Sequence, residues 1–229
     1  MTIKLKYALP VAVVFLGIAT APAQTVAGES GLAVNIPDND ASGILRTVDV
    51  TGLADNTAYQ ITASLDLSGT GLGGYGGDIY AYLSHQSDDG TYTLCVLLNR
   101  IGRDSLNSSG YSDNSINITL DDSALQDVHQ SGQISALIGT WQPDGRDLSP
   151  FDSITSSPRT TTLDSLGLSD PNGTWNLFIA DVQAGGTMQL DSWSVDITPI
   201  PEPAPLTLAG AGSLILFSLN HLRRSRIRQ

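Results

Sequence analysis

Short runs of alternating apolar and polar residues recur along the middle of the chain. Clusters rich in Asp, Asn, Gly and Pro separate these runs, for example Asp38-Asn39-Asp40 and Pro171-Asn172-Gly173, and such clusters mark turns. No long segment between residues 24 and 200 keeps the period of a helix. The runs predict nine strands, near Leu32–Ile36, Ile44–Val50, Gln60–Leu67, Asp78–Ser84, Thr91–Leu98, Ser115–Leu120, Gln133–Ile138, Thr174–Ala180 and Met188–Ile197.

Nine short strands must pair into two sheets, or close into a barrel, to bury one face each. The pattern therefore predicts an all-β domain, either a sandwich or a jelly roll. Trp193 alternates with Val195 and Ile197, which places the three side chains on one face of the last strand. We expect Trp175 and Trp193 to pack in the core rather than to form a platform for sugars.

The N-terminal residues follow a different pattern. Two lysines precede an apolar run over residues 7–18, and small residues follow up to Ala23. This order is typical of a secretory signal peptide, which signal peptidase removes. We expect cleavage between Ala23 and Gln24, with Ala27 as the alternative position. An uncleaved anchor is disfavoured by the small residues before Gln24.

The C-terminal residues also differ from the middle of the chain. Pro201-Glu202-Pro203 precedes the apolar stretch Ala204–Leu222, whose length is close to the roughly 20 residues that cross a bilayer as a helix. Basic residues beside a membrane span stay in the cytoplasm, so the domain before this span is expected outside. The arginines after the span are Arg223, Arg224, Arg226 and Arg228.

This ending resembles the PEP-CTERM sorting signal of Gram-negative bacteria, in Pro201-Glu202-Pro203, in the Gly- and Leu-rich segment Leu206–Leu219 and in the terminal arginines. The resemblance implies that an exosortase, a membrane protease-transpeptidase, recognises and processes the tail. It also implies a protein first anchored in the inner membrane facing the periplasm, then delivered to the cell surface or the medium. A generic tail anchor is the alternative. The chain thus divides into a signal peptide (1–23), a β domain (24–200) and a sorting tail (201–229).

Charge and cysteine content limit the partners of the β domain. Residues 24–200 contain 22 acidic residues, nearly all Asp, but only five arginines and no lysine. A surface this acidic repels nucleic acid and anionic lipid headgroups. Cys95 is the single cysteine, so it cannot form an intramolecular disulfide, and its apolar neighbours favour a buried, inert thiol.

Short motifs follow one another in a fixed order along the β domain. They include Ile36-Pro37-Asp38, Gly77-Asp78-Ile79, Arg100-Ile101-Gly102, Gly139-Thr140-Trp141, Gly173-Thr174-Trp175, Ala180-Asp181 and Leu190-Asp191-Ser192-Trp193. This order resembles the P domain (Homo B domain) of proprotein convertases, the β-sandwich that follows a subtilisin-like protease domain. The resemblance spans about Val34 to Ile197 and implies a jelly-roll sandwich of the galactose-binding-like type.

Catalytic chemistry is not predicted. A nucleophilic triad needs a base, and His85 and His129 are the histidines available in the β domain. Neither lies in a serine-protease motif, there is no G-x-S-x-G sequence, and we expect both to be surface or turn residues. Zinc is disfavoured by one Cys and two scattered His. Carboxylate pairs for glycoside hydrolysis remain open, because an Asp-rich chain always offers pairs.

Calcium is the metal that the composition allows. It takes several oxygen ligands from carboxylates and loop carbonyls. Four aspartates at strand edges in the matching motifs are the candidate ligands: Asp78, Asp121, Asp122 and Asp181. Their alternative role is to cap turns through hydrogen bonds to backbone amides.

These observations favour an exported, exosortase-sorted, non-catalytic protein of the cell surface or extracellular matrix, whose P domain serves as a binding or structural module. The alternative is an accessory P domain that stabilises a separately encoded subtilisin-like serine endopeptidase. A carbohydrate-active enzyme or lectin rests on the jelly-roll shape alone. The expected partners are signal peptidase, exosortase and a surface polymer or protein, with a subtilisin-like protease as the partner under the alternative.

Overall fold

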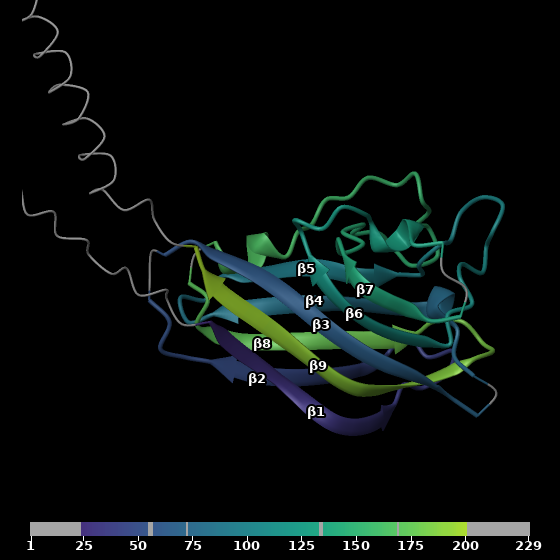
Figure 1. The fold of residues 1–229 in the computed structure, drawn as a ribbon, viewed down its shortest axis with the longest axis horizontal. Coiled ribbons are helices and arrows are strands. Elements are labelled where there is room, and N and C mark those ends of the chain that lie inside the picture. The colour runs from purple at the N-terminus through teal and green to yellow at the C-terminus, as the bar shows by residue number, and fades with distance from the viewer. Residues whose placement is uncertain (1–23, 55–56, 72, 133–134, 169, 201–229) are drawn as a thin grey trace, which may run out of the picture.

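The computed structural model describes residues 24–54, 57–71, 73–132, 135–168 and 170–200. These residues form nine β-strands and three short 3₁₀ helices (η) but no α-helix. Figure 1 shows the strands gathered into one body. In chain order the elements are β1 (Thr25–Asn35), β2 (Ile44–Val50), β3 (Tyr59–Thr70), η1 (Gly76–Asp78), β4 (Ile79–Ser87), β5 (Tyr92–Asn99), β6 (Ser115–Asp121), η2 (Val128–Gln130), β7 (Leu137–Trp141), η3 (Asp164–Gly167), β8 (Gly173–Asp181) and β9 (Thr187–Pro199).

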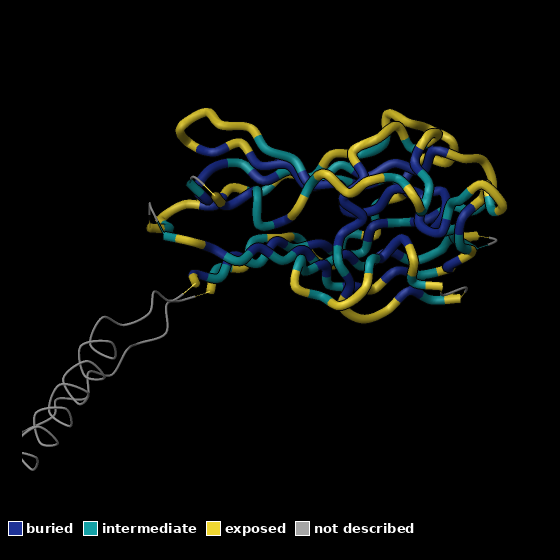
Figure 2. Tube along the Cα trace, turned by 90° about the horizontal axis from the view of Figure 1, so that it is seen from above, coloured by how far each residue is buried: buried dark blue, intermediate teal, exposed yellow. Residues whose placement is uncertain are grey.

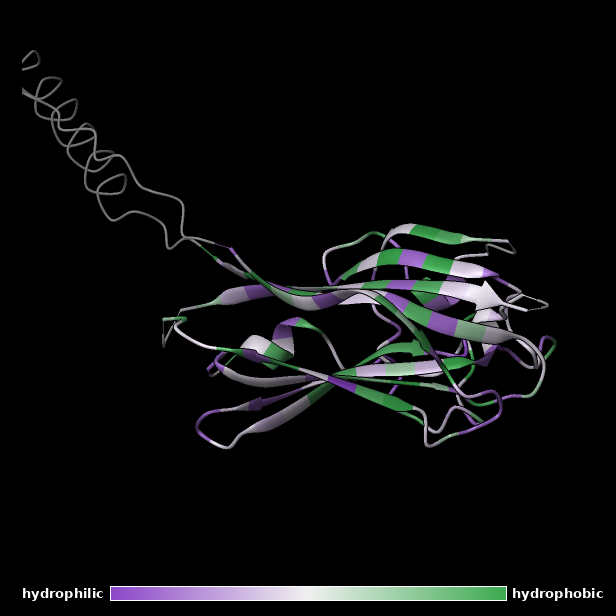
Figure 3. Ribbon diagram, turned by 90° about the horizontal axis from the view of Figure 1, so that it is seen from below, coloured by the Kyte–Doolittle hydropathy of each residue, from purple (hydrophilic) through white to green (hydrophobic). Residues whose placement is uncertain are grey.

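The strands form two sheets, as the sequence predicted. One sheet has the order β1-β9-β3-β6-β7 and the other has the order β2-β8-β4-β5. All pairs are antiparallel except β6 with β7. The two sheets lie as layers over each other (Figure 3), so the domain is a β-sandwich. Each of the nine predicted strands overlaps an observed one.

The core lies between the sheets and follows the alternation in the sequence. In β3 the buried residues are every second one from Tyr59 to Leu67, and the residues between them are half-buried. The inner face of β8 contributes Trp175, Leu177 and Ile179, none of which has exposed surface. Figure 2 shows these buried segments as dark blue stretches inside the two layers. Cys95 is also buried in this core, as predicted for an inert thiol.

An irregularity in β9 sets the positions of its large side chains. The pairing register with β3 shifts between Asp66 and Leu67, so that Leu65 faces Trp193 and Leu67 faces Leu190. Such a bulge inserts one extra residue into a strand and changes which residues face inward. Leu190 and Trp193 are therefore both buried although three positions separate them. Beyond the bulge, Trp193, Val195 and Ile197 share the inner face, as predicted.

The two ends of the described domain lie side by side. β1 begins where β9 ends, because Thr25 pairs with Ile197. Figure 1 shows both strand ends on the left of the domain, whereas the turn from β8 into β9 lies on the right. β9 has 13 residues, so about 40 Å separates these two ends of the sandwich.

The predicted signal peptide and sorting tail lie outside the described residues, as do Pro201, Glu202, Pro203 and the four terminal arginines. Gln24, which follows the predicted cleavage position, is the first residue that the structure describes, and it is exposed. Within the described ranges, no helix is long and apolar enough to cross a membrane.

Candidate functional site

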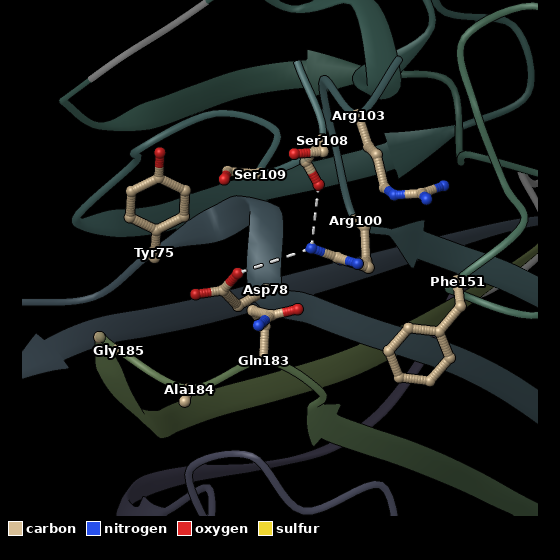
Figure 4. Close-up of a pocket in the computed structure, with 11 residues that line it drawn as sticks. Tyr75, Asp78, Arg100, Arg103, Ser108, Ser109, Phe151, Gln183, Ala184 and Gly185 are labelled. Carbon is tan, nitrogen blue, oxygen red and sulfur yellow. Dashed lines mark hydrogen bonds and ion pairs between the residues drawn. The ribbon is translucent and has the colours of Figure 1, made fainter. Parts of the chain in front are cut away.

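A pocket of about 570 Å³ lies at the end of the sandwich where β8 turns into β9. Three separate parts of the chain supply its charged and polar side chains (Figure 4). Asp78 comes from η1 just before β4, Arg100 and Arg103 follow β5, and Gln183 lies in the turn after β8. Tyr75, Ser108, Ser109, Phe151, Ala184, Gly185 and Gly186 complete the wall.

Strand pairing and a glycine position Asp78 at this pocket. Ile79 pairs with Asp181 across β4 and β8, so Asp78 and Asp181 lie at the same sheet end. Gly77 permits the close approach of the next loop: a Cβ atom added there would lie 2.1 Å from the carbonyl oxygen of Ser109. Any larger residue at Gly77 would therefore push the loop with Ser108 and Ser109 away from Asp78.

Burial changes the acidity of the two carboxyl groups. Burial, the carboxylate of Asp181 and that of Asp38 raise the pKa of Asp78 to about 7, against the opposing effect of Arg100. Burial likewise raises the pKa of Asp181 to about 6, although a hydrogen bond from the backbone N–H of Gln183 favours its ionised form. Both side chains are almost fully buried, with Asp78 at 4% exposure.

Arg100 is held in place from several sides. Its φ of +53° lies in the left-handed region, which is uncommon for a residue with a side chain. Its Nε donates to the carbonyl of Gly77 at 3.0 Å and its Nη2 to the carbonyl of Ser108 at 3.2 Å. Nη2 also lies 4.0 Å from the carboxylate of Asp78. Burial and repulsion from Arg103 lower the pKa of the Arg100 guanidinium.

Both histidines are buried, so the expectation of a surface position is wrong. The expectation of a turn holds for His129, which lies in η2, but not for His85, which lies in β4. The ring of His85 stacks on Trp175 with centroids 4.2 Å apart. Its two nitrogens lie 2.9 Å from the carbonyl oxygen of Leu166 and 3.1 Å from that of Asn172. Long-range strand pairing places His85 inside the sandwich, which its polar neighbours in the sequence did not indicate.

His129 is buried in a network of charged groups. Its Nδ1 lies 2.7 Å from a carboxylate oxygen of Asp144, and its Nε2 lies 2.9 Å from the carbonyl of Arg103. Arg146 bonds the other oxygen of Asp144 at 3.2 Å and a carboxylate oxygen of Asp127 at 2.7 Å. Because partners occupy both nitrogens of each histidine, neither is placed to accept a proton from a nucleophile.

The four aspartates proposed as calcium ligands do not form one site. Asp78 and Asp181 lie at the pocket, beside the turn into β9. Asp121 pairs with Thr62, which pairs with Asp196 near the end of β9, so Asp121 and Asp122 lie at the opposite end of the sandwich.

The carboxylates at the pocket do not fit a calcium ion either. The Arg100 guanidinium lies beside Asp78, where it supplies the positive charge that a cation would bring. Across the described ranges, no group of three or more His, Cys, Asp or Glu side chains is spaced to hold a metal ion. Asp122 instead accepts a hydrogen bond from the backbone N–H of Asp164, and Asp121 one from that of Ser123, the turn-capping role that was the alternative.

Asp113 is a buried carboxyl group that the sequence did not single out. It has no exposed surface, and neither side-chain oxygen has a hydrogen-bond partner among the residues that the structure describes. Burial raises its pKa to about 6. In the sequence it stands between Ser112 and Asn114, and this polar segment has the composition of an ordinary turn. Nothing in the sequence therefore distinguished Asp113 from the exposed aspartates.

Three raised pKa values predict that the domain loses stability as the pH rises from about 4 to about 7. A carboxyl group with a raised pKa binds its proton more tightly in the folded chain than in the unfolded chain, where the pKa is about 3.9. Its contribution is therefore present at low pH and lost as the pH passes the folded pKa, which is about 7 for Asp78 and about 6 for Asp113 and Asp181. We expect a higher melting temperature at pH 5 than at pH 8.

Melting followed by tryptophan fluorescence measures this effect. Asp78→Asn and Asp113→Asn should each reduce the difference in melting temperature between pH 5 and pH 8. Asp88→Asn is the control, because the Asp88 side chain is exposed. A melting temperature that stays constant or increases from pH 5 to pH 8 would show that the buried carboxyl groups do not control stability.

Comparison with known proteins leaves the family open. No family model and no curated protein matches the chain. Among solved structures, the chain is similar to the complex of the Aeromonas sobria serine protease with its chaperone, at 15% identity and a TM-score of 0.40. It is also similar to the VP2 subviral particle of infectious bursal disease virus, at 12% identity and a TM-score of 0.27.

The two comparisons differ in how much of each chain they cover. The first covers 80% of this chain and 27% of the protease complex chain, and the second covers 93% of this chain and 55% of the viral chain. This chain therefore spans about a quarter of the first protein and about half of the second. The class that the structure itself defines is a β-sandwich with a charged pocket at one end.

Proposed function

We propose that this protein is an exported, non-catalytic binding module of the bacterial cell surface, built on a jelly-roll P domain. The pocket at the β8–β9 end is the observation that carries the proposal. It brings together one carboxyl group and two guanidinium groups from separate parts of the chain. The histidines, by contrast, are buried and bonded at both nitrogens. The pocket thus offers charged groups that can bind a ligand, while neither histidine is free to act as a base.

The location of the pocket supports a role at a surface. The described domain begins and ends at one end of the sandwich, where Thr25 pairs with Ile197. The pocket lies at the opposite end, about 40 Å away along β9. If the stretch Ala204–Leu222 spans the inner membrane and exosortase acts on Pro201-Glu202-Pro203, the pocket faces away from the membrane. A domain held in this way presents its pocket to soluble or surface-bound partners.

Ligand binding and turnover can be measured on the full-length chain purified in detergent. A ligand that binds only the folded state raises the melting temperature. Peptides, neutral glycans and small acids would be screened by melting, and peptide and glycan cleavage would be followed in parallel. We expect at least one ligand to raise the melting temperature of the parent and of Arg159→Gln but not of Arg103→Gln, without cleavage.

Arg159 is a matched control because its guanidinium bonds to Gln142 and to backbone carbonyls outside this pocket. Cleavage that disappears in His85→Ala or His129→Ala would contradict a non-catalytic role. If only a subtilisin-like protease raised the melting temperature, and did so equally in Arg103→Gln, the result would favour the alternative role as an accessory domain of such a protease.

A further inference from the structure

Within the described ranges, Arg103 and Arg159 form no ion pair, although residues 24–200 contain 22 acidic residues for five arginines. Arg159 donates three hydrogen bonds instead. Arg46 pairs with Glu29, and Arg146 pairs with two aspartates. Over the described ranges, Arg103 forms no ion pair, and its guanidinium donates one hydrogen bond, from Nη1 to the carbonyl of Ser153. Its Nε is buried without a partner. A buried N–H group without a partner is costly.

The other arginine of the pocket does not relieve this cost. Arg100 lies close enough to Arg103 for their repulsion to lower the pKa of Arg100. Within the described ranges, Asp78 is the carboxylate that lies within 4.0 Å of Arg100, and it offsets part of the Arg100 charge. Figure 4 shows both guanidinium groups at the same pocket. An anion bound there would compensate the charge of Arg103, which forms no ion pair among the described residues.

We propose that this pocket binds the C-terminal carboxylate of a polypeptide, with the carboxylate on Arg100 and Arg103 and the last side chain against Phe151. This inference rests on the proposed function and names its ligand class. A guanidinium matches a carboxylate because two parallel N–H groups meet two oxygens. The terminal N–H groups of Arg103 are available for such a bond, since among the described residues its guanidinium donates one hydrogen bond, from Nη1 to the carbonyl of Ser153.

The wall of the pocket fits the end of a peptide better than a charged polymer. Phe151 is 53% exposed and Tyr75 lies across the pocket from it, so apolar contact is available beside the charged groups (Figure 4). The domain around the pocket is strongly acidic and repels a chain of many negative charges. A peptide terminus brings a single negative charge together with a side chain. The volume of about 570 Å³ lies in the range of small-ligand sites.

Paired peptides test this assignment. The probes are acetyl-Gly-Gly-Leu-Phe with a free carboxylate and the same peptide as its C-terminal amide, titrated by calorimetry into the full-length chain in detergent. We expect the free acid to bind at least about tenfold more tightly than the amide, because each 1.4 kcal/mol corresponds to a factor of ten and charge-assisted hydrogen bonds reach this size. Acetate alone should bind weakly, since it lacks the contact with Phe151.

Substitutions at the pocket identify which residues contact the peptide. Arg103→Gln should weaken binding of the free acid about tenfold or more and leave the amide unchanged, whereas Arg159→Gln should change neither. Phe151→Ala should weaken a peptide ending in Phe more than one ending in Gly, and Phe151 is exposed enough for the variant to fold. Unchanged tryptophan fluorescence would show that each variant keeps its core.

Several results would overturn the inference: equal binding of acid and amide, no dependence on Arg103, no binding by either peptide, or binding by an oligouronate in place of the peptides. If the screen then found a different ligand that depends on Arg103, the proposed binding function would stand and only the peptide terminus would be excluded. Cleavage of the probe peptides would instead contradict the non-catalytic function itself.

Discussion

Replacing Trp175 with alanine is expected to lower the free energy of unfolding by about 3–5 kcal/mol. Trp175 has no exposed surface and lies on the inner face of β8. Its ring stacks on His85, and its indole N–H donates to the carbonyl of Pro171 at 3.1 Å. The substitution removes the buried apolar surface, the stacking on His85 and the indole hydrogen bond, and it leaves a cavity between the sheets. Because domains are stable by about 5–15 kcal/mol, this loss is a large fraction of the total stability.

Denaturant titration followed by circular dichroism measures this loss. Trp175→Phe should lose less, since most of the apolar volume remains while the indole hydrogen bond is removed. Tyr92→Ala on β5 is the surface control, because the Tyr92 side chain is 57% exposed. A loss below about 1 kcal/mol for Trp175→Ala would mean that the ring is not in the core, and it would favour a role for Trp175 in sugar binding.

Asp144→Asn is the second substitution with a large expected effect, a loss of about 3–5 kcal/mol. Asp144 has no exposed surface and is the carboxylate that joins His129 to Arg146. It also accepts a hydrogen bond from the backbone N–H of Asn99. Removing its charge leaves Asp127 as the one remaining carboxylate for the buried Arg146 and takes the anionic partner from the buried His129, and breaking a buried charge network is strongly destabilising.

A half-exposed ion pair provides the matched comparison. Arg46 and Glu29 form a salt bridge with 32% and 25% of their side-chain surfaces exposed. Glu29→Gln should therefore cost only about 0–1 kcal/mol, because water screens this pair. Denaturant titration of both variants under the same conditions compares the two losses directly. If the two losses were equal, the buried network around Asp144 would not have the role that its geometry indicates.

The fold was predictable from the sequence because alternation reports burial within each strand. β2 begins and ends as predicted, since Ile44–Val50 lies between clear turns. β1 begins at Thr25, seven residues before its predicted start at Leu32. It is an edge strand whose first half has few apolar residues, and its pairing with β9 is irregular between Ser30 and Val34. The inner face of β1 is only half-buried, whereas that of β3 is buried, so the apolar alternation of β1 is weaker.

The candidate site was predictable only in part. Asp78 and Asp181 were singled out from their motifs, and the structure brings them together. Long-range strand pairing aligns the strand ends that bring Arg100 and Arg103 beside Asp78. No local sequence pattern reveals this pairing. The burial of His85 and His129 has the same origin, since their partners lie as much as 87 residues away in the chain.

An immunoblot of cell fractions, with an antibody against the β domain, tests most directly whether the chain is exported and sorted. Cells would produce the parent chain or a variant with alanines at Pro201-Glu202-Pro203. The two prolines keep this tripeptide from joining the helix predicted after it. We expect the parent chain to be trimmed at its tail and to reach the surface or the medium. The variant should keep its C-terminal tail and stay in the inner membrane, facing the periplasm. Domain found in the cytoplasm, or equal trimming and release of parent and variant, would contradict an exported and sorted binding module.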